Sequence, residues 1–270
     1  MIPIRCRCWS VLPTLALLAF PLSGECAQAE GTLNALDLLH KVADAYAKLD
    51  SYEWTARSIW RFDNGVRKEQ SPGFTLIIAA FRRPGQMRLE VRPLSAGPFA
   101  GTSITNGTTV WDYRPYLQVC CHPDLTPFPP YVAAALGSSL PYERITEKLK
   151  WATFAGISTL TVDRQSIRCL LVDALYEPET RHFTVPVGSE WTQSAVTYWI
   201  DPKTNLVMQQ HHHEIRKSTV SGRINAPYHS YRTVSLVNFR VNPQLPDSLF
   251  NFKIPKDVRE TKHCPSSGGG

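Results

Sequence analysis

The sequence predicts an α+β domain that is mainly β: a large, strongly curled antiparallel sheet with an N-terminal helix and a helical lid over an apolar cavity. Three observations predict it. Residues 34–50 have the helical period, most later segments alternate with a period of two, and a proline-rich, helix-like segment interrupts them midway. A long sheet in one domain must curl or be covered, because its apolar face has to be buried.

The first 29 residues are typical of a secretory signal peptide. "MIPIRCRCW" supplies two arginines, "SVLPTLALLAFPL" is a short apolar stretch, and Ala27 and Ala29 are the small residues of a cleavage site. The alternative is an uncleaved membrane anchor, but the stretch is shorter than the ~20 residues of a spanning helix and contains Pro13. We expect cleavage after Ala29 and a periplasmic protein.

A bacterial lipoprotein signal is a third reading of this segment, because Cys26 follows "LSGE". Such a signal needs a small residue directly before the cysteine, and Glu25 occupies that position. We therefore expect Cys26 not to be acylated. Residues 30–260 are predicted to form a single domain, and residues 261–270, which contain "PSSGGG", a disordered tail.

Four cysteines follow the predicted signal: Cys120, Cys121, Cys169 and Cys264. An even number in an exported protein favours disulfides, and four cysteines allow three connectivities. A bridge between two adjacent cysteines is strained, so we expect one of Cys120 and Cys121 to pair with Cys169 and the other with Cys264. A structural zinc site is the alternative, and the sequence has no C-x-x-C pair to support it.

The predicted helix begins near Asn34, a good N-cap, and has Asp37 in its first turn. Its apolar stripe consists of Leu36, Leu39, Val42 or Ala43, Tyr46 and Leu49. In "YEWTARSIWRF", which follows, aromatic and small residues alternate with polar ones, as in a strand with one aromatic face. "FTLIIAAF" is apolar at both parities, so neither face of that strand should meet bulk water.

"QMRLEVR" alternates again, and "TSITNGTTVWDY" has Asn106-Gly107 between strand-like flanks, which is a hairpin signal. The segment 123–160 is predicted to interrupt the sheet with two short helices, near residues 131–136 and 142–151. Four further strands are expected in "SIRCLLVDALYE", "SAVTYWID", "NLVMQQHHHEI" and "YHSYRTVSLVNFRV".

Four stretches in order, "FRRPGQMRLEV", "SITNGTTVWDYRPY", "YWIDPKTNLV" and "SLFNFKIPKDV", resemble the LolA/LolB-like superfamily over nearly all of residues 33–258. That superfamily includes the periplasmic lipoprotein carrier, its outer-membrane acceptor and the RseB/MucB sensors. Asn205 stands where glycine is common, and Lys256 and Asp257 where proline and glycine are usual. The resemblance implies an unclosed β-barrel with a helical lid and a cavity for acyl chains.

In the carrier, an arginine directly before a proline holds the lid through hydrogen bonds, and the matching position here is Arg83, before Pro84. A guanidinium suits this role because it offers five donors in a fixed fork. The alternative is a solvated arginine at a strand end, like Arg82. Candidates for lining the cavity, each of which could instead simply fill the core, are Trp54, Trp60, Phe74, Leu76, Ile78, Met87, Leu89 and Trp111.

Two functions are therefore predicted. The first is a carrier or chaperone that shields lipid or the acyl chains of lipoproteins, with inner- or outer-membrane sorting proteins as partners. The second is an RseB-like sensor that binds an anti-sigma factor or another envelope protein. The chain has no G-x-S-x-G, phosphate-binding glycine loop or H-E-x-x-H motif, so we expect no enzyme and no cofactor. The charge of +6 is spread along the chain, so we expect no nucleic-acid partner. We also expect the protein to be a monomer.

The histidine triplet in "QQHHHEI" looks like a metal site but lies in a predicted strand. His211 and His213 then share one face while His212 points to the other, so the three cannot converge on one ion. A weak zinc or nickel site at His211 and His213 is the alternative. We expect no metal and a solvated strand that titrates near pH 6.5.

Overall fold

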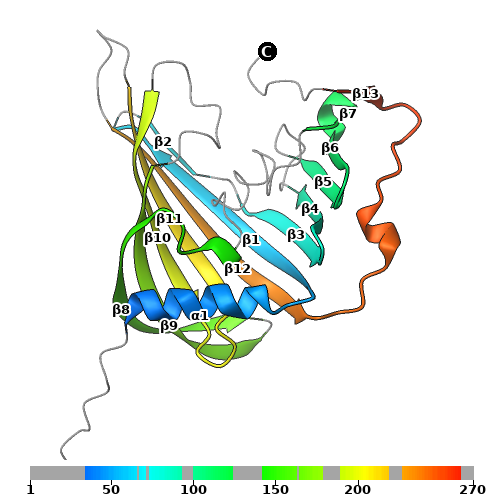
Figure 1. Ribbon diagram of the computed structural model, residues 1–270. Helices are drawn as coiled ribbons and strands as arrows, with labels where there is room; N and C mark the ends of the chain where they lie inside the picture. The colour runs from blue at the N-terminus through cyan, green and yellow to red at the C-terminus, as the bar shows by residue number, and fades with distance from the viewer. Residues whose placement is uncertain are drawn as a thin grey trace, which may run out of the picture. The chain divides into compact units, whose positions relative to one another are not determined.

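The computed structural model describes residues 34–65, 67–70, 73–92, 100–123, 142–162, 164–178, 189–218 and 227–262 (Figure 1). All of them belong to one compact unit, Leu33–Gly270. The predicted signal peptide, Cys26, the expected helix at residues 131–136 and Cys264 lie outside these ranges. None of the helices in the described ranges has the length and hydropathy of a membrane span.

The described elements are mostly strands, as predicted. They are the helix α1 (Ala35–Ala47), the 3-10 helices η1 (Pro115–Leu117), η2 (Tyr142–Arg144) and η3 (Asp247–Phe250), and the strands β1 (Ser51–Asp63), β2 (Lys68–Gln70), β3 (Thr75–Arg82), β4 (Gln86–Arg92), β5 (Gly101–Asn106), β6 (Val110–Arg114), β7 (Val119–Cys121), β8 (Leu149–Val162), β9 (Gln165–Tyr176), β10 (Ser189–Ile200), β11 (Val207–Ser218), β12 (Tyr228–Val241) and β13 (Arg259–Thr261).

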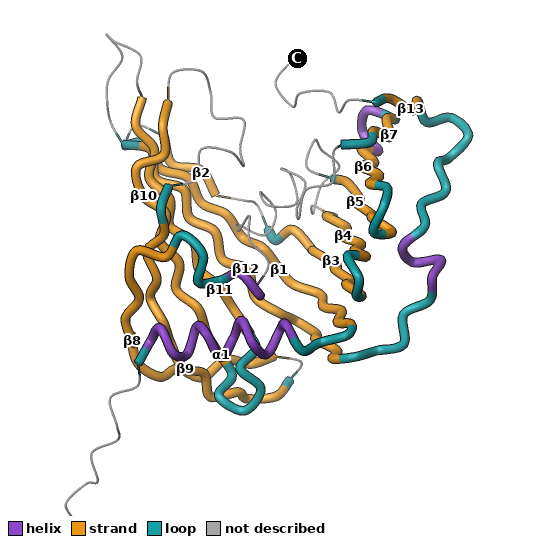
Figure 2. Tube along the Cα trace, in the orientation of Figure 1, coloured by secondary structure: helices purple, strands orange, loops and turns teal. Residues whose placement is uncertain are grey.

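All of these strands belong to one sheet with the order β13-β7-β6-β5-β4-β3-β1-β12-β11-β10-β9-β8, and β2 pairs with β1 beside this path (Figure 2). Every pairing is antiparallel except that of β13 with β7. The end strands β13 and β8 do not pair with each other, so the sheet is not closed into a barrel. β8 and β12 are separated by three strands but approach within 8 Å, which a flat sheet with ~4.8 Å spacing does not allow. The predicted unclosed, curled sheet is confirmed.

Helix α1 starts where the sequence predicts. The Asn34 side chain accepts a hydrogen bond from the backbone N–H of Leu36 at 2.9 Å, which satisfies one donor of the first turn. Leu39, Val42 and Tyr46 are buried, as expected. Leu36 is a correction: it is 43% exposed, because the buried stripe is completed by Ala35 and Leu38 instead.

The face of the sheet on which α1 packs is called the inner face here. The Tyr46 ring of α1 contacts the ring of Tyr52 on β1, with centroids 5.6 Å apart, and that of Phe239 on β12. Tyr52, Trp54 and the other even-numbered residues of β1 up to Ser58 are buried, while Glu53, Thr55 and Arg57 between them are more exposed. The predicted aromatic face of β1 therefore faces the helix.

The opposite, outer face is covered in part near β3 by the segment that follows β12. Ala80 on the outer face of β3 packs with Leu245 and Phe250 in a second cluster of buried residues. Ile77 on the inner face of the same strand is fully buried. This explains why β3 is apolar at both parities.

The expected helix at residues 142–151 is a correction. Only the single turn η2 forms there, and β8 begins at Leu149. Beyond Lys150 the residues of β8 alternate between exposed and half-buried, as in a strand, and pairing with β9 satisfies their backbone groups. The helix-like spacing around Ile145 reflects one buried side chain rather than a helical face.

Two turn predictions are confirmed. Asn106 and Gly107 lie in the hairpin between β5 and β6, and Gly107 has a φ of 97°. Asn205, where the related motif has glycine, has a φ of 57° in the turn between β10 and β11.

The cysteines differ from the prediction in one respect. Cys121 is disulfide-bonded, with a partner outside the described residues. Cys120 and Cys169 are both unpaired and buried, so the expected bridge to Cys169 is wrong. Burial raises the pKa of both thiols to about 11. The predicted tail boundary also shifts slightly, because Thr261 belongs to β13.

Candidate functional site

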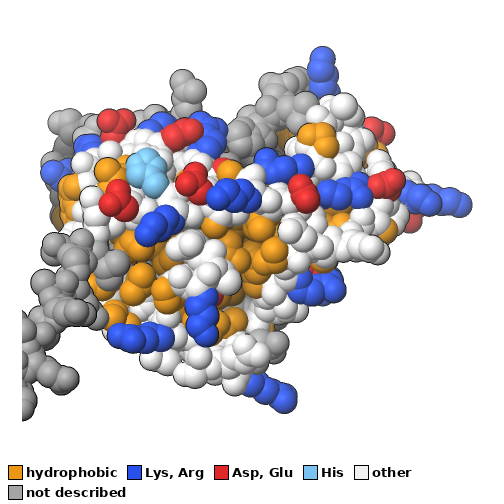
Figure 3. All heavy atoms as spheres, turned by 60° about the horizontal axis from the view of Figure 1, so that its bottom comes forward, with side chains coloured by type: hydrophobic (Ala, Val, Ile, Leu, Met, Phe, Trp, Pro, Cys, Tyr) orange, Lys and Arg blue, Asp and Glu red, His pale blue; other side chains and the backbone are white. Residues whose placement is uncertain are grey.

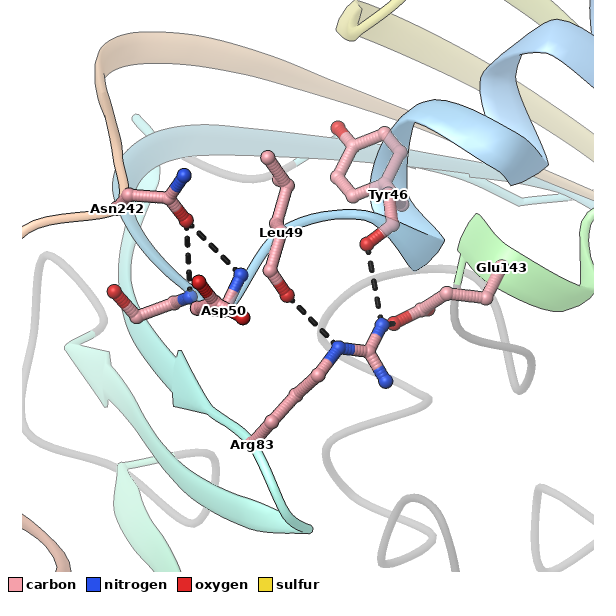
Figure 4. Close-up of polar contacts among 7 residues, drawn as sticks. Tyr46, Leu49, Asp50, Arg83, Glu143 and Asn242 are labelled. Carbon is pink, nitrogen blue, oxygen red and sulfur yellow. Dashed lines mark hydrogen bonds and ion pairs between the residues drawn. The ribbon is translucent and has the colours of Figure 1, made fainter.

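Arg83 lies at the point where α1, the β3–β4 turn and η2 meet (Figure 4). Its Nε donates to the backbone carbonyl of Leu49 at 2.8 Å, and its Nη2 donates to the carbonyl of Tyr46 at 3.3 Å. The same Nη2 lies 3.4 Å from Oε1 of Glu143 in η2. One guanidinium fork thus satisfies carbonyls at the C-terminal end of α1 and forms an ion pair with η2.

The backbone around Arg83 fixes the start of its side chain. The Arg83 N–H donates to the carbonyl of Asp50 at 2.9 Å, and the Arg83-Pro84 peptide bond is cis. Gly85 follows with a φ of 65°, which closes the turn to β4. On the other side, the Asn242 side chain accepts from the N–H of Asp50 at 3.0 Å (Figure 4). The link between α1 and β1 is therefore held from two sides.

The segment around η2 is docked on the sheet by tyrosines. The rings of Tyr142 and Tyr46 lie 4.6 Å apart. The Tyr176 hydroxyl donates to the carbonyl of Ile145 at 2.8 Å and is 3.1 Å from the hydroxyl of Tyr198. Burial raises the pKa of Tyr176 to about 12, so its hydroxyl stays a neutral donor. These contacts and the Arg83–Glu143 pair hold η2 against α1 and the inner face.

The register divides the eight expected cavity residues into two groups. Trp54 pairs with Ala79 and Ala79 with Leu89, so these share the inner face. Ile78 pairs with Glu90 and points to the outer face. By the same alternation the inner group is Trp54, Trp60, Met87 and Leu89.

The outer group consists of Phe74, Leu76, Ile78 and Trp111. The Phe74 ring is 36% exposed and lies under the guanidinium of Arg57, 4.8 Å from its carbon. Trp111 pairs with Ile104 on β5. Ile104 faces outward, because the preceding residue, Ser103, pairs with Leu89 on the inner face. The eight residues therefore do not share one space, and only the inner group lies on the side of α1.

Apolar surface is also visible beside α1. Figure 3, which views the molecule from the side of α1 and the ends of β8 and β9, shows hydrophobic side chains gathered in a patch bordered by Lys and Arg. Such patches are uncommon on soluble domains unless they bind something apolar.

The histidine triplet alternates as predicted but is not solvated. His212 faces inward and is only 2% exposed, and burial lowers its pKa to about 3. On the outer face His213 stacks on Tyr231, with centroids 4.4 Å apart, and its Nε2 lies 3.0 Å from Nδ1 of His229. Burial also lowers the pKa of His211 and of His213. The expected titration near pH 6.5 is therefore wrong for His212, and the pKa values of its two neighbours lie below it.

Sequence reasoning missed the polar side chains on the inner face of β11 and β12, above all His212 and Arg232. The signal was present, because strict alternation places His212 on the face opposite to its two neighbours. Within the described ranges, no group of three or more His, Cys, Asp and Glu side chains is arranged to hold a metal ion.

Comparison with known proteins gives weak similarities. No family model matches the chain, and no curated protein matches it. Among solved structures, the chain is similar to an uncharacterized conserved protein from Thermus thermophilus, with 10% identity over 85% of this chain and 99% of that one and a TM-score of 0.44.

A LolA superfamily protein from Nitrosomonas europaea matches with 9% identity over 82% of this chain and 98% of that one, at a TM-score of 0.34. A putative outer membrane lipoprotein-sorting protein domain from Vibrio parahaemolyticus matches with 11% identity over 81% of this chain and 97% of that one, at a TM-score of 0.31. Because these TM-scores are all below 0.5, the function is inferred below from the residues of the chain itself.

Proposed function

We propose that this protein is a periplasmic carrier that shields the acyl chains of a lipid or lipoprotein on the inner face of its sheet. The observation that carries the proposal is the position of Arg83. A single side chain bonds α1 and η2, the described elements that lie over the inner face, and it does so at the edge of that face.

The inner face supplies the binding energy. Trp54, Met87 and Leu89 are buried apolar residues of the inner face, and Trp60 continues this face along β1. Burial of one CH₂ group contributes about 0.8 kcal/mol, so an acyl chain of ordinary length outweighs the cost of its own ordering. In this proposal the chain first contacts the protein at the apolar patch beside α1 (Figure 3).

In this proposal α1 and η2 form a lid, and Arg83 holds this lid closed through its hydrogen bonds and ion pair. Its bonds to two carbonyls and one carboxylate are together worth about 1 kcal/mol, because the side chain is 41% exposed to water. Losing them is a small cost compared with the burial of an acyl chain. Entry of the chain can therefore separate η2 from the end of α1 while the buried residues of α1 stay packed on the sheet.

Delivery requires partners, and the proposal includes membrane-bound sorting proteins that load and unload the carrier. Their identity does not affect the first test. Native mass spectrometry of the protein purified from a periplasmic extract should show a species heavier by the mass of a lipid. Protein stripped of lipid should regain that mass when palmitate is added. Stripped, folded protein that binds no acyl compound at all would contradict the proposal.

A further inference from the structure

The inner face becomes polar where β11 and β12 continue beyond the region of α1. His212 and Arg232 lie directly opposite each other in the antiparallel pairing of these strands. Arg232 is in turn opposite Trp60 on β1. His212 has the same parity as Gln210, whose partner Val234 belongs to the main buried cluster. All of these side chains therefore face inward.

Two of these buried polar atoms have no partner. His212 is 2% exposed, yet its Nε2 has no hydrogen-bond partner in the described part of the chain. The same holds for Nη1 of Arg232, which is itself buried although the side chain as a whole is partly exposed. Unpaired buried donors are costly and rare in folded proteins, and a water or a ligand can satisfy them.

Charged side chains of both signs lie at this end of the inner face. Arg216 and Glu214 share the inward parity of β11, pairing with Tyr228 and Ser230. The described inward side chains of β11 and β12 thus carry two guanidiniums and one carboxylate. Burial lowers the pKa of Arg232, the charge of Glu214 opposes this shift, and Nη1 of Arg232 has no hydrogen-bond partner in the described structure. Glu69 of β2, opposite the inward-facing Phe62, adds a second carboxylate to this face and forms an ion pair with Arg67.

We propose that His212 and Arg232 bind the anionic head of an amphiphile, a carboxylate or a phosphate, whose acyl chain lies along the inner face. This deepens the proposed function and rests on it. The guanidinium offers a fork of N–H donors that matches both oxyanions. The neutral imidazole, in the tautomer protonated at Nε2, adds one more donor. Trp60 and Val234 place apolar surface directly beside the head, where the chain begins.

The test compares ligands that differ only in the head. Palmitate, hexadecanol and a lysophosphatidic acid with the same chain length are titrated into the lipid-free protein by calorimetry, below their aggregation concentrations. The wild-type protein should bind one or both anionic ligands about tenfold more tightly than the alcohol, as expected for charge-assisted hydrogen bonds. Which anion binds more tightly decides between a carboxylate and a phosphate head.

The variant Arg232→Met should abolish this preference, with palmitate binding reduced about tenfold and hexadecanol binding changed less than twofold. His212→Phe should reduce the preference in part. The matched control is Arg61→Met, because Arg61 lies one residue along β1 from Trp60 on the outer face, over the ring of Tyr231. The control should leave the preference intact.

Two failures are distinguishable. If the wild type binds all three ligands equally, or Arg232→Met keeps the preference, the head site is wrong while acyl binding stands. If none of the three binds, the proposed function itself fails. Should Arg232→Met not fold, as judged by its thermal melting, Arg232→Lys replaces it. That variant keeps the charge but loses the fork, and should lose most of the preference.

Discussion

The guanidinium of Arg83 donates to the carbonyl of Leu49 at 2.8 Å, so the turn between β3 and β4 holds the end of α1. The same side chain forms an ion pair with Glu143 of η2. A residue that resembles ordinary surface charge in the sequence thus joins the β3–β4 turn to both described elements over the inner face.

Replacing Arg83 by leucine should loosen α1 and η2 while the sheet stays folded. The loss of two bonds to carbonyls and one ion pair is expected to cost about 1 kcal/mol, after allowance for solvent exposure. Hydrogen exchange followed by mass spectrometry should show faster exchange in peptides from α1 and η2, and faster uptake and release of a bound acyl compound.

Arg92→Leu is the matched control for this change. Arg92 ends β4, and its ion pair is with Glu90 of the same strand. Hydrogen exchange in α1 should be unchanged in Arg92→Leu. Equal exchange rates in wild type and Arg83→Leu would show that Arg83 does not hold the lid.

His212 should make the protein less stable in mild acid. In an unfolded chain the imidazole binds a proton below about pH 6.5, whereas folding lowers the pKa of His212 to about 3. Between these values the unfolded state binds more protons, so the free energy of unfolding falls by about 1.4 kcal/mol for each unit that the pH drops.

Urea denaturation at pH 7.5 and pH 5.5 measures this slope. His212→Gln should make it shallower, whereas His40→Gln, on the exposed side of α1, should leave it unchanged. An unaltered slope in His212→Gln would show that His212 is not buried as a neutral group.

Cys264 is the predicted partner of Cys121. In the parallel pairing of β7 and β13, Cys121 lies opposite Thr261, three residues before Cys264. Peptide mapping without reduction should recover this pair, and Cys120 and Cys169 should react with alkylating reagents only after unfolding. Cys264→Ser should cost about 2–4 kcal/mol of stability, as is typical when a disulfide is removed. A bridge that contains Cys169 would contradict the structure.

Phe250 should be essential for the cover over the outer face of β3. It is fully buried, contacts Ala80 and lies under the guanidinium of Arg82 at 4.9 Å. Phe250→Ala should reduce the free energy of unfolding by about 3–5 kcal/mol in urea titrations. Leu117→Ala, at a site that is 41% exposed, serves as the control and should cost less than about 0.5 kcal/mol. Equal effects of the two would show that the cover is not packed.

The parts of the fold that were predictable are those with a local signal. The cap at Asn34, the alternation along β1 and the turn at Asn205 depend on neighbouring residues, and each was predicted. β8 was not predicted as a strand, and its first residues were assigned to a helix, because the pairing with β9 that makes it a strand leaves no local signal. The split of the eight cavity candidates between the two faces of the sheet could not be predicted for a similar reason. The sequence of an apolar strand such as β3 does not show which residues face inward, and only its pairing with β1 and β4 places Ile77 inward and Ile78 outward.

The measurement that most directly tests the inner face as the lipid-binding surface is quenching of tryptophan fluorescence by palmitate brominated along its chain. Trp60 is on the inner face and Trp111 on the outer face. Quenching should be strong in the wild type, clearly weaker in Trp60→Phe, and unchanged in Trp111→Phe. Quenching that disappears in Trp111→Phe but persists in Trp60→Phe would place the acyl chain on the wrong side of the sheet and contradict the proposed function.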